Sequence, residues 1–361
     1  MEGYLVLEDG SVFKGAVFGA QEESYGELIF NTSMTGYQEI LYDPSYKGQI
    51  VVMTYPLIGN YGVNNEDVES SRIHLEGFVV RERSKIYSNW RATKPLDMLL
   101  YEHGVPGIEG VDTREVTIKL RDKGAMKAGI FAGKHSVKKM IEKVKKSPDI
   151  VGVDLVKEVI KDKPYIWSDR GKYKVVVIDC GVKYNILRLL AERNMKVLVM
   201  PANTPWEEID KEKPDGILVS NGPGDPSAVP YLVKTLSHLI EKYPLFGICF
   251  GIQIIAQVLG GRTYKLKFGH HGANHPVKDI KTGKVYITVQ NHGFCVDINT
   301  LSENDVEITH INLNDSTLEG ISHKKLPVFA VQFHPEFSPG PLDAIYLFDR
   351  FKETIKERAG E

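Results

Sequence analysis

The chain has 361 residues, more than the about 250–300 residues at which a single hydrophobic core stops growing, so we expect two domains. Its 45 Lys and Arg residues nearly balance its 47 Asp and Glu residues, and this charge pattern favours neither a nucleic-acid nor a membrane partner. The cysteines Cys180, Cys249 and Cys295 are far apart and odd in number, so they predict neither a disulfide framework nor a Cys-x-x-Cys metal site. Since Met1 to Glu8 lacks a basic start and no run is long enough to span a membrane, we expect a soluble, cytoplasmic protein.

Residues 1–150 are predicted to form a β-rich N-terminal α/β domain. Asp9-Gly10 separates two apolar runs and favours a tight hairpin turn, because this dipeptide tolerates positive φ. Further strands are expected at 27–31 and 49–54, which are short and rich in β-branched residues.

Hydroxyl and amide side chains are dense between these two strands, at 32–46. Such side chains hydrogen-bond nearby backbone as readily as a ligand, so a capped loop and a binding loop are equally good interpretations. Asp112 or Thr113 is expected to cap a helix that ends near Lys123, with Gly124 just past its end. A second helix, 136–146, carries five lysines, which a solvated surface explains better than an acidic partner does.

Residues 147–172 contain two prolines and many charges without sustained periodicity, which is typical of a connection between domains, and we place this linker at 151–172. From 173 to 361 strands and helices alternate, which predicts an α/β domain with a mostly parallel sheet flanked by helices. Strands are expected at 175–179, 196–200, 216–220, 245–248 and 328–333, helices at 185–194, 228–242 and 342–358, and shorter β runs at 285–290, 306–311 and 318–322.

Gly247-Ile248-Cys249-Phe250-Gly251 lies where one of these strands passes into a helix. Glycines on both sides of a cysteine allow the strained turn of a nucleophile elbow, which lifts the thiol above the sheet edge. At a helix N-terminus the partial positive charge favours the thiolate, which is the nucleophilic form. The alternative is that Cys249 is a small buried hydrophobic residue, as most free cysteines are.

A thiol nucleophile needs a base, and His334 with Glu336 is the best candidate pair. Both follow a predicted buried strand, and Pro335 stiffens the segment between them. The tetrahedral intermediate would need two backbone N–H groups, one from Phe250 and one from Gly222 or Gly224 in the loop after the third strand.

Three histidines occur between Lys267 and Pro276, so a metal site has to be weighed. No carboxylate or cysteine cluster lies nearby in the sequence, and Gly and Pro interrupt any helical presentation. We therefore predict no metal site.

Together these motifs resemble those of the class I glutamine amidotransferases: the cysteine elbow, the loop 221–226, and His334-Pro335-Glu336. Four further segments, 30–46, 112–114, 268–277 and 290–294, resemble the small-subunit family of carbamoyl-phosphate synthases, and the resemblance spans nearly the whole chain. Two positions depart from the common pattern of the family. Ile252 stands where a polar residue or His is frequent, and Phe250 where Leu is frequent.

The resemblance implies that Cys249 attacks the side-chain amide of L-glutamine, His334 transfers the proton and Glu336 orients His334. Ammonia would pass to a large subunit that binds ATP and Mg and makes carbamoyl phosphate for pyrimidine or arginine synthesis, while this chain needs no cofactor. The residues that the resemblance places in the glutamine pocket are Ser45, Gly222, Gly224, Phe250, Gln253, Asn291, Gly293 and Phe294.

Two other functions stay open from the sequence. A glutaminase subunit of another synthase is disfavoured by the N-terminal domain, and a catalytically silent regulatory subunit is disfavoured by the intact Cys249, His334 and Glu336 set.

Overall fold

The computed structural model describes residues 1–361 and divides into two compact units. Unit 1 comprises Met1–Val153 and Lys267–Gly272, and unit 2 comprises Asp154–Leu266 and Ala273–Glu361. None of the helices has both the length and the apolar character that a membrane crossing requires.

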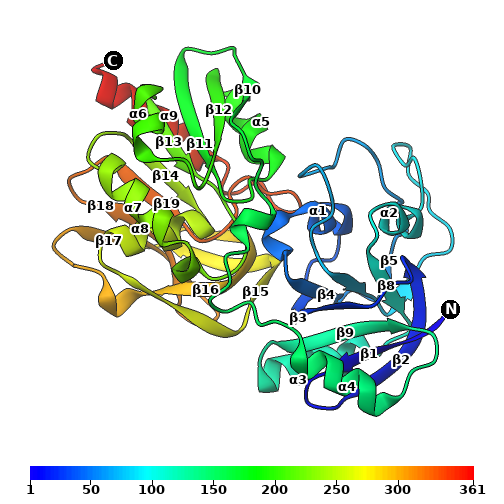
Figure 1. Ribbon diagram of the computed structural model, residues 1–361. Helices are drawn as coiled ribbons and strands as arrows, with labels where there is room; N and C mark the ends of the chain where they lie inside the picture. The colour runs from blue at the N-terminus through cyan, green and yellow to red at the C-terminus, as the bar shows by residue number, and fades with distance from the viewer. The chain divides into compact units, whose positions relative to one another are not determined.

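Unit 1 is built on a closed barrel (Figure 1). Its strands are β1 (Glu2–Leu7), β2 (Val12–Gly19), β3 (Ser24–Asn31), β4 (Gln49–Met53), β6 (Gly77–Val79), β8 (Pro106–Glu109) and β9 (Met126–Ala132). They close in the order β1-β2-β8-β6-β4-β3-β9. The other elements are α1 (Tyr37–Tyr42), η1 (Pro44–Tyr46), α2 (Leu96–Glu102), α3 (Thr113–Lys123), α4 (Val137–Lys146) and the paired strands β5 (Leu57–Ile58) and β7 (Glu82–Arg83).

Local chemistry explains the elements of unit 1 that the sequence predicts. The hairpin of β1 and β2 pairs Leu5 with Phe13, and Gly10 in its turn has a φ of +93°. The side chain of Asp112 accepts a hydrogen bond from the N–H of Glu115 at 3.0 Å, and α3 ends before Gly124. The predicted hairpin and helix cap are thus confirmed.

Unit 2 contains a ten-stranded sheet. Its strands are β10 (Tyr165–Ser168), β11 (Tyr173–Asp179), β12 (Met195–Pro201), β13 (Gly216–Val219), β14 (Leu245–Ile248), β15 (Arg262–Asp279), β16 (Val285–Asp297), β17 (Val306–Asn312), β18 (Leu318–His323) and β19 (Val328–Val331). The central order β12-β11-β13-β14-β19 is parallel, and β10 and β18 pair antiparallel at its two edges.

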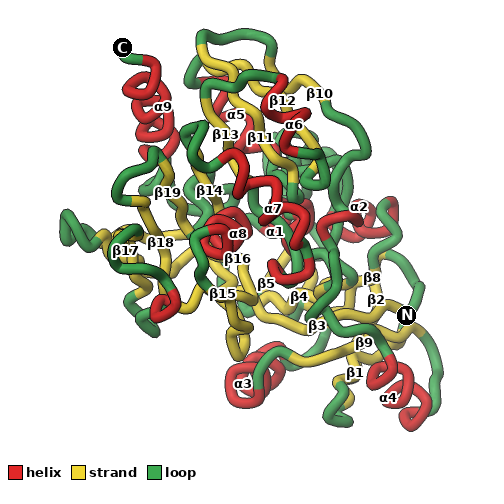
Figure 2. The backbone as a smooth tube through the Cα atoms, turned by 60° about the vertical axis from the view of Figure 1, so that its left-hand side comes forward, coloured by secondary structure: helices red, strands yellow, loops and turns green.

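Helices cover both faces of the parallel strands (Figure 2). The helices are α5 (Tyr184–Glu192), α6 (Trp206–Lys211), α7 (Pro230–Leu239), α8 (Phe250–Val258) and α9 (Tyr346–Ala359), and the 3-10 turns are η2 (Val156–Glu158), η3 (Pro226–Ala228) and η4 (Ile298–Thr300). Val176 and Ile178 of β11 pack with α6, α7 and α8, whereas Val175 and Val177 pack with α5 and α9. This alternation is what a strand buried on both faces requires.

Three segments differ from the expectations. The predicted connection 151–172 contains η2 and β10, and β10 pairs with β12. The histidine-rich segment 267–276, for which no strand is predicted, lies within the long strand β15. The run predicted at 285–290 extends to Asp297 as β16. β10 pairs with β12 and β15 pairs with β17, and neither pairing can be read from the sequence of the segment itself.

Candidate active site

Cys249 sits at the turn between β14 and α8. Its φ of 54° and ψ of −100° are strained for a residue with a side chain, and such strain occurs preferentially at functional sites. Its N–H donates to the carbonyl of Val331 at 2.8 Å, which ties the turn to β19. A Cβ on Gly251 would lie 2.3 Å from the carbonyl oxygen of Val219, so only glycine fits there. The predicted strand–turn–helix arrangement around Cys249 is confirmed.

His334 and Glu336 follow β19 and are both buried. The N–H of His334 donates to the carbonyl of Val289 at 2.9 Å, which extends the sheet contact beyond β19. Nδ1 of His334 lies 2.6 Å from Oε1 of Glu336, while Nε2 has no hydrogen-bond partner in the structure. The carboxylate therefore orients the ring and leaves Nε2 available for proton transfer.

The charges at this site couple His334 to both of its neighbours. Burial disfavours the imidazolium, but the Glu336 carboxylate and the Cys249 sulfur outweigh burial and raise the pKa of His334. Burial also opposes the charge of Glu336, yet Lys183 and His334 hold the pKa of this carboxyl below its ordinary value. The site thus favours a protonated His334 beside an ionised Glu336.

Lys183 is a site residue that the sequence reasoning missed. Its Nζ lies 2.9 Å from Oε1 of Glu336 and donates to the carbonyl of Phe337 at 2.8 Å, and the lysine and glutamate side chains are 2% and 0% exposed. Asn185 donates to the Glu336 carbonyl at 2.6 Å. The signal was the position of Lys183, four residues after β11, at the carboxyl edge where Cys249 also lies.

Polar groups from α8 and β16 surround the sulfur. The Cys249 thiol donates to the carbonyl of Asn291 at 3.5 Å. Gln253 donates to the carbonyl of Phe294 at 2.8 Å and to Oε1 of Gln332 at 3.2 Å. Nε2 of Gln332 in turn lies 3.7 Å from Sγ, a contact that the sequence reasoning also missed, although Gln332 is a lone polar residue in an apolar run.

Of the predicted pocket residues, Asn291 contacts the Cys249 sulfur through its carbonyl, and Gln253 of α8 donates to Phe294 and to Gln332, which lies beside the sulfur. A Cβ on Gly293 would meet no atom within 4 Å, so open space lies beside this backbone. Ser45 lies in η1 of unit 1, where its N–H donates to Oδ1 of Asp43 at 2.9 Å, and its contribution to a glutamine pocket stays a prediction.

The glycine loop 221–226 follows β13, the parallel neighbour of β14. The side-chain oxygen of Asn221 accepts from the N–H of Lys183 at 3.2 Å, and a Cβ on Gly222 would lie 2.5 Å from the Cys180 carbonyl oxygen. Gly224 has a φ of +80°. The loop is therefore fixed at the same sheet edge as the elbow, where its N–H groups can serve a substrate oxygen.

Comparisons with known proteins match both halves of the chain. The family model of the carbamoyl-phosphate synthase small chain, CPSase domain, matches residues 5–130, and that of glutamine amidotransferase class-I matches residues 176–354. The carbamoyl phosphate synthase small chain of Aquifex aeolicus is 55% identical, covering 99% of this chain and 98% of that protein. The protein of the same name from Akkermansia muciniphila is 53% identical, covering 98% of each chain, and that from Methanocaldococcus jannaschii is 51% identical, covering 99% of each.

Proposed function

Because the chain belongs to the carbamoyl phosphate synthase small-chain family and is a glutamine amidotransferase, we propose that it releases ammonia from L-glutamine through a thioester on Cys249. The ammonia passes to a separate, ATP-dependent large subunit that forms carbamoyl phosphate. The observation that carries this proposal is the buried series Cys249, His334 and Glu336, in which the carboxylate holds Nδ1 of the imidazole at 2.6 Å.

The first half of the reaction forms the thioester. With the thiol proton on His334, the sulfur attacks the carboxamide carbon, and a C–S bond and an oxyanion form. The N–H groups of Phe250 and of Gly222 or Gly224 stabilise this oxyanion. The imidazolium then gives its proton to the amide nitrogen as the C–N bond breaks, and ammonia leaves.

The second half regenerates the enzyme. Water attacks the thioester carbonyl while Nε2 of His334 takes a proton from it. The C–S bond breaks, glutamate is released, and the proton returns to the Cys249–His334 pair. Glu336 stays ionised throughout and keeps the ring in place, with Lys183 compensating its buried charge.

Recognition of glutamine is assigned to the groups around the elbow. Asn291 is supported by its contact with the sulfur, Gln253 and Phe294 by the hydrogen bond between them, and Gly293 by the open space beside its backbone. Ser45 belongs to the proposed pocket by resemblance alone.

No cofactor or metal is assigned to this chain, and ATP and Mg are assigned to the large subunit. A cytoplasmic location stays a prediction.

Substitution of the nucleophile in the assembled enzyme tests the proposal. Cys249→Ala should lower glutamine-dependent carbamoyl phosphate synthesis by at least about 10³-fold, because the intermediate cannot form. Synthesis from free ammonia should stay within about twofold, since those steps lie on the large subunit. Rapid acid quench with labelled glutamine should trap a thioester on the wild type only.

Cys295→Ala is the matched control, because Cys295 is also buried but its thiol bonds to the carbonyls of Val296 and Leu318. It should retain glutamine use. Loss of ammonia-dependent synthesis in Cys249→Ala would overturn the assignment of Cys249 to glutamine chemistry alone. Absence of both thioester and glutamate release, with the large subunit bound, would favour a silent regulatory subunit.

A further inference from the structure

Two large apolar side chains stand in solvent on one loop of unit 1. Trp90 is 90% exposed and Ile86 is 80% exposed, and both lie in the segment 84–93 between β7 and α2. Single exposed apolar residues are ordinary on protein surfaces, but tryptophan is the residue most enriched among the energetic centres of protein interfaces. The loop therefore exposes a side chain that is costly to leave in water.

The backbone of this loop is fixed rather than free. The N–H groups of Ser84, Ser88 and Thr93 donate to the carbonyls of Ile58, Asn60 and Val63 at 2.8, 2.9 and 2.8 Å, so three points of the loop are bonded to one neighbouring segment. Adjacent to Trp90, the side chain of Asn89 accepts from the N–H of Arg91 at 2.9 Å.

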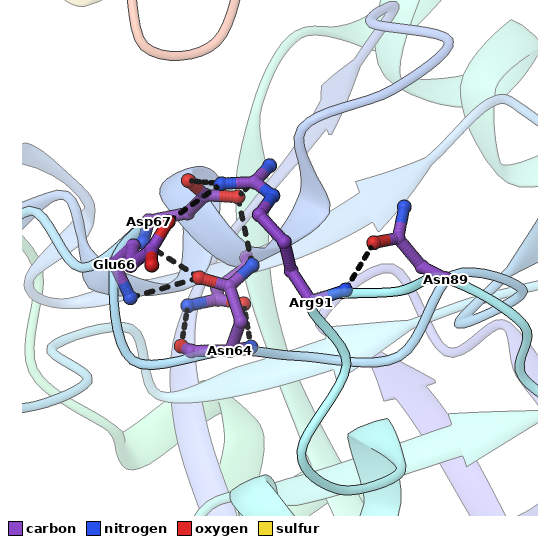
Figure 3. Close-up of polar contacts among 6 residues, drawn as sticks. Asn64, Glu66, Asp67, Asn89 and Arg91 are labelled. Atoms are coloured by element: carbon purple, nitrogen blue, oxygen red, sulfur yellow. Dashed lines mark hydrogen bonds and ion pairs between the residues drawn. The ribbon is translucent and has the colours of Figure 1, made fainter.

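Arg91 fixes the loop a second time, through the contacts that Figure 3 shows. Its guanidinium makes a bidentate contact with Asp67 at 2.7 and 2.9 Å. Asn64 holds Asp67 in turn, with its amide nitrogen 2.8 Å from the carboxylate and its oxygen accepting from the N–H groups of Glu66 and Asp67. These contacts fix the residues on both sides of Trp90, and the Arg91 guanidinium lies over the Trp90 ring, 5.8 Å from its centroid, so less conformational freedom is lost when a partner binds.

The charges around the loop indicate what kind of surface it fits. The basic residues Arg83, Lys85, Arg91 and Lys94 each have an acidic partner within unit 1, respectively Asp97, Glu109, Asp67 and Glu102. This compensation leaves no basic patch for nucleic acid or an anionic membrane. An uncharged, apolar depression on a protein is the complementary surface.

We infer that segment 84–93, with Trp90 and Ile86 as its anchors, is a docking surface for the large ATP-dependent subunit. The inference rests on the proposed function, which requires that a second protein receive the ammonia. Trp90 inserts into an apolar depression of that subunit, and the Arg91–Asp67 pair holds it in the binding conformation.

Binding of the purified large subunit to the full-length chain tests the inference. Trp90→Ala should raise the dissociation constant at least about tenfold, as expected for an anchor residue, while glutaminase activity of the free chain stays unchanged. Asp67→Asn, which retains Trp90 but weakens its support, should have a smaller effect. Tyr101→Ala is the control, since Tyr101 is a 70% exposed aromatic residue on α2 of the same unit.

Fluorescence gives a second readout. The chain has three tryptophans, and in a Trp167→Phe, Trp206→Phe background only Trp90 remains. Its emission should shift to shorter wavelength and become less accessible to acrylamide when the large subunit binds.

The outcomes separate the inference from the proposed function. If the wild-type chain binds the large subunit and Trp90→Ala binds equally well, the inference is wrong and the proposed function stands. Trp90-dependent self-association without an effect on the large subunit would also overturn it, in favour of a second copy of this chain. If the wild-type chain does not bind the large subunit, the proposed function fails and the inference fails with it.

Discussion

The buried ion pair of Lys183 and Glu336 supports the orientation of His334, because Glu336 also contacts Nδ1 of the imidazole. A buried charge is stable only when a partner compensates it, and both side chains are almost fully excluded from water. Burial by itself would raise the pKa of Glu336, but Lys183, followed by His334, reverses that effect. The lysine therefore keeps ionised the carboxylate that holds Nδ1 of His334.

Lys183→Met should destabilise the fold by about 3–5 kcal/mol at pH 7, because it leaves the Glu336 charge without its cation. The pKa of Glu336 is lower in the folded than in the unfolded chain. Its ionised form therefore stabilises the fold at pH values above the unfolded-state pKa, and this stabilisation is lost as the pH falls toward the folded-state pKa. The stability gap between variant and wild type should therefore narrow below the ordinary carboxyl pKa of 4.5. Urea unfolding of both proteins, from pH 7 to below the ordinary carboxyl pKa, measures this difference in the free energy of unfolding.

Lys242→Met serves as the control, because Lys242 forms an exposed pair with Asp210. It should change stability by no more than about 1 kcal/mol at any pH. A Lys183→Met gap that stays constant down to acid pH would show that the loss comes from packing and not from the ion pair.

Among the elements, the turn from β14 to α8 has the tightest steric requirement. Gly251→Ala would place a methyl group against the carbonyl of Val219 in β13, and backbone cannot move aside as a flexible side chain can. We expect a loss of about 1–3 kcal/mol in the free energy of unfolding. Glutamine hydrolysis should fall as well, since β13 carries the glycine loop.

Gly260→Ala, just beyond the other end of α8, is the control for replacing a glycine. No atom lies within 4 Å of the added Cβ. Placing an alanine at the φ of +85° found at Gly260 should lower the free energy of unfolding by only about 1 kcal/mol. Hydrolysis should be retained in this variant. Equal activity losses in the two variants would contradict a steric role for Gly251.

Elements that are fixed by contacts between residues close in the sequence could be predicted. Elements that depend on pairing with a distant strand could not. Asp112 caps α3 through the N–H of Glu115, a contact within one turn. By contrast, β15 depends on partners such as β17, so its polar, Gly-containing sequence gave no warning of an 18-residue strand. The triad motifs were recognisable because each follows a strand, whereas Lys183 and Gln332 are single polar residues without a motif.

At the scale of the whole molecule, the chain leaves unit 1 after Val153 and returns to it for one short segment. Lys267–Gly272 belongs to unit 1, although the residues before and after it belong to unit 2. Within unit 1 the carbonyl of Lys267 accepts from the N–H of Ala125 at 2.8 Å, and that of His271 from the N–H of Thr32 at 3.1 Å. Unit 1 is therefore not complete as the contiguous segment 1–153.

Phe268→Ala tests how much this returning segment contributes. Phe268 stacks on Phe30 with ring centroids 5.7 Å apart, and both rings are partly buried. We expect a loss on the order of 2 kcal/mol, below the about 3–5 kcal/mol of a fully buried Phe, and faster hydrogen exchange at the Thr32 and Ala125 amides. Tyr264→Ala, on the part of β15 that belongs to unit 2, should leave exchange at those two amides unchanged. Unchanged exchange at the Thr32 and Ala125 amides in Phe268→Ala would contradict this prediction. It would show that packing of Phe268 does not control how often these two amides separate from the segment 267–272.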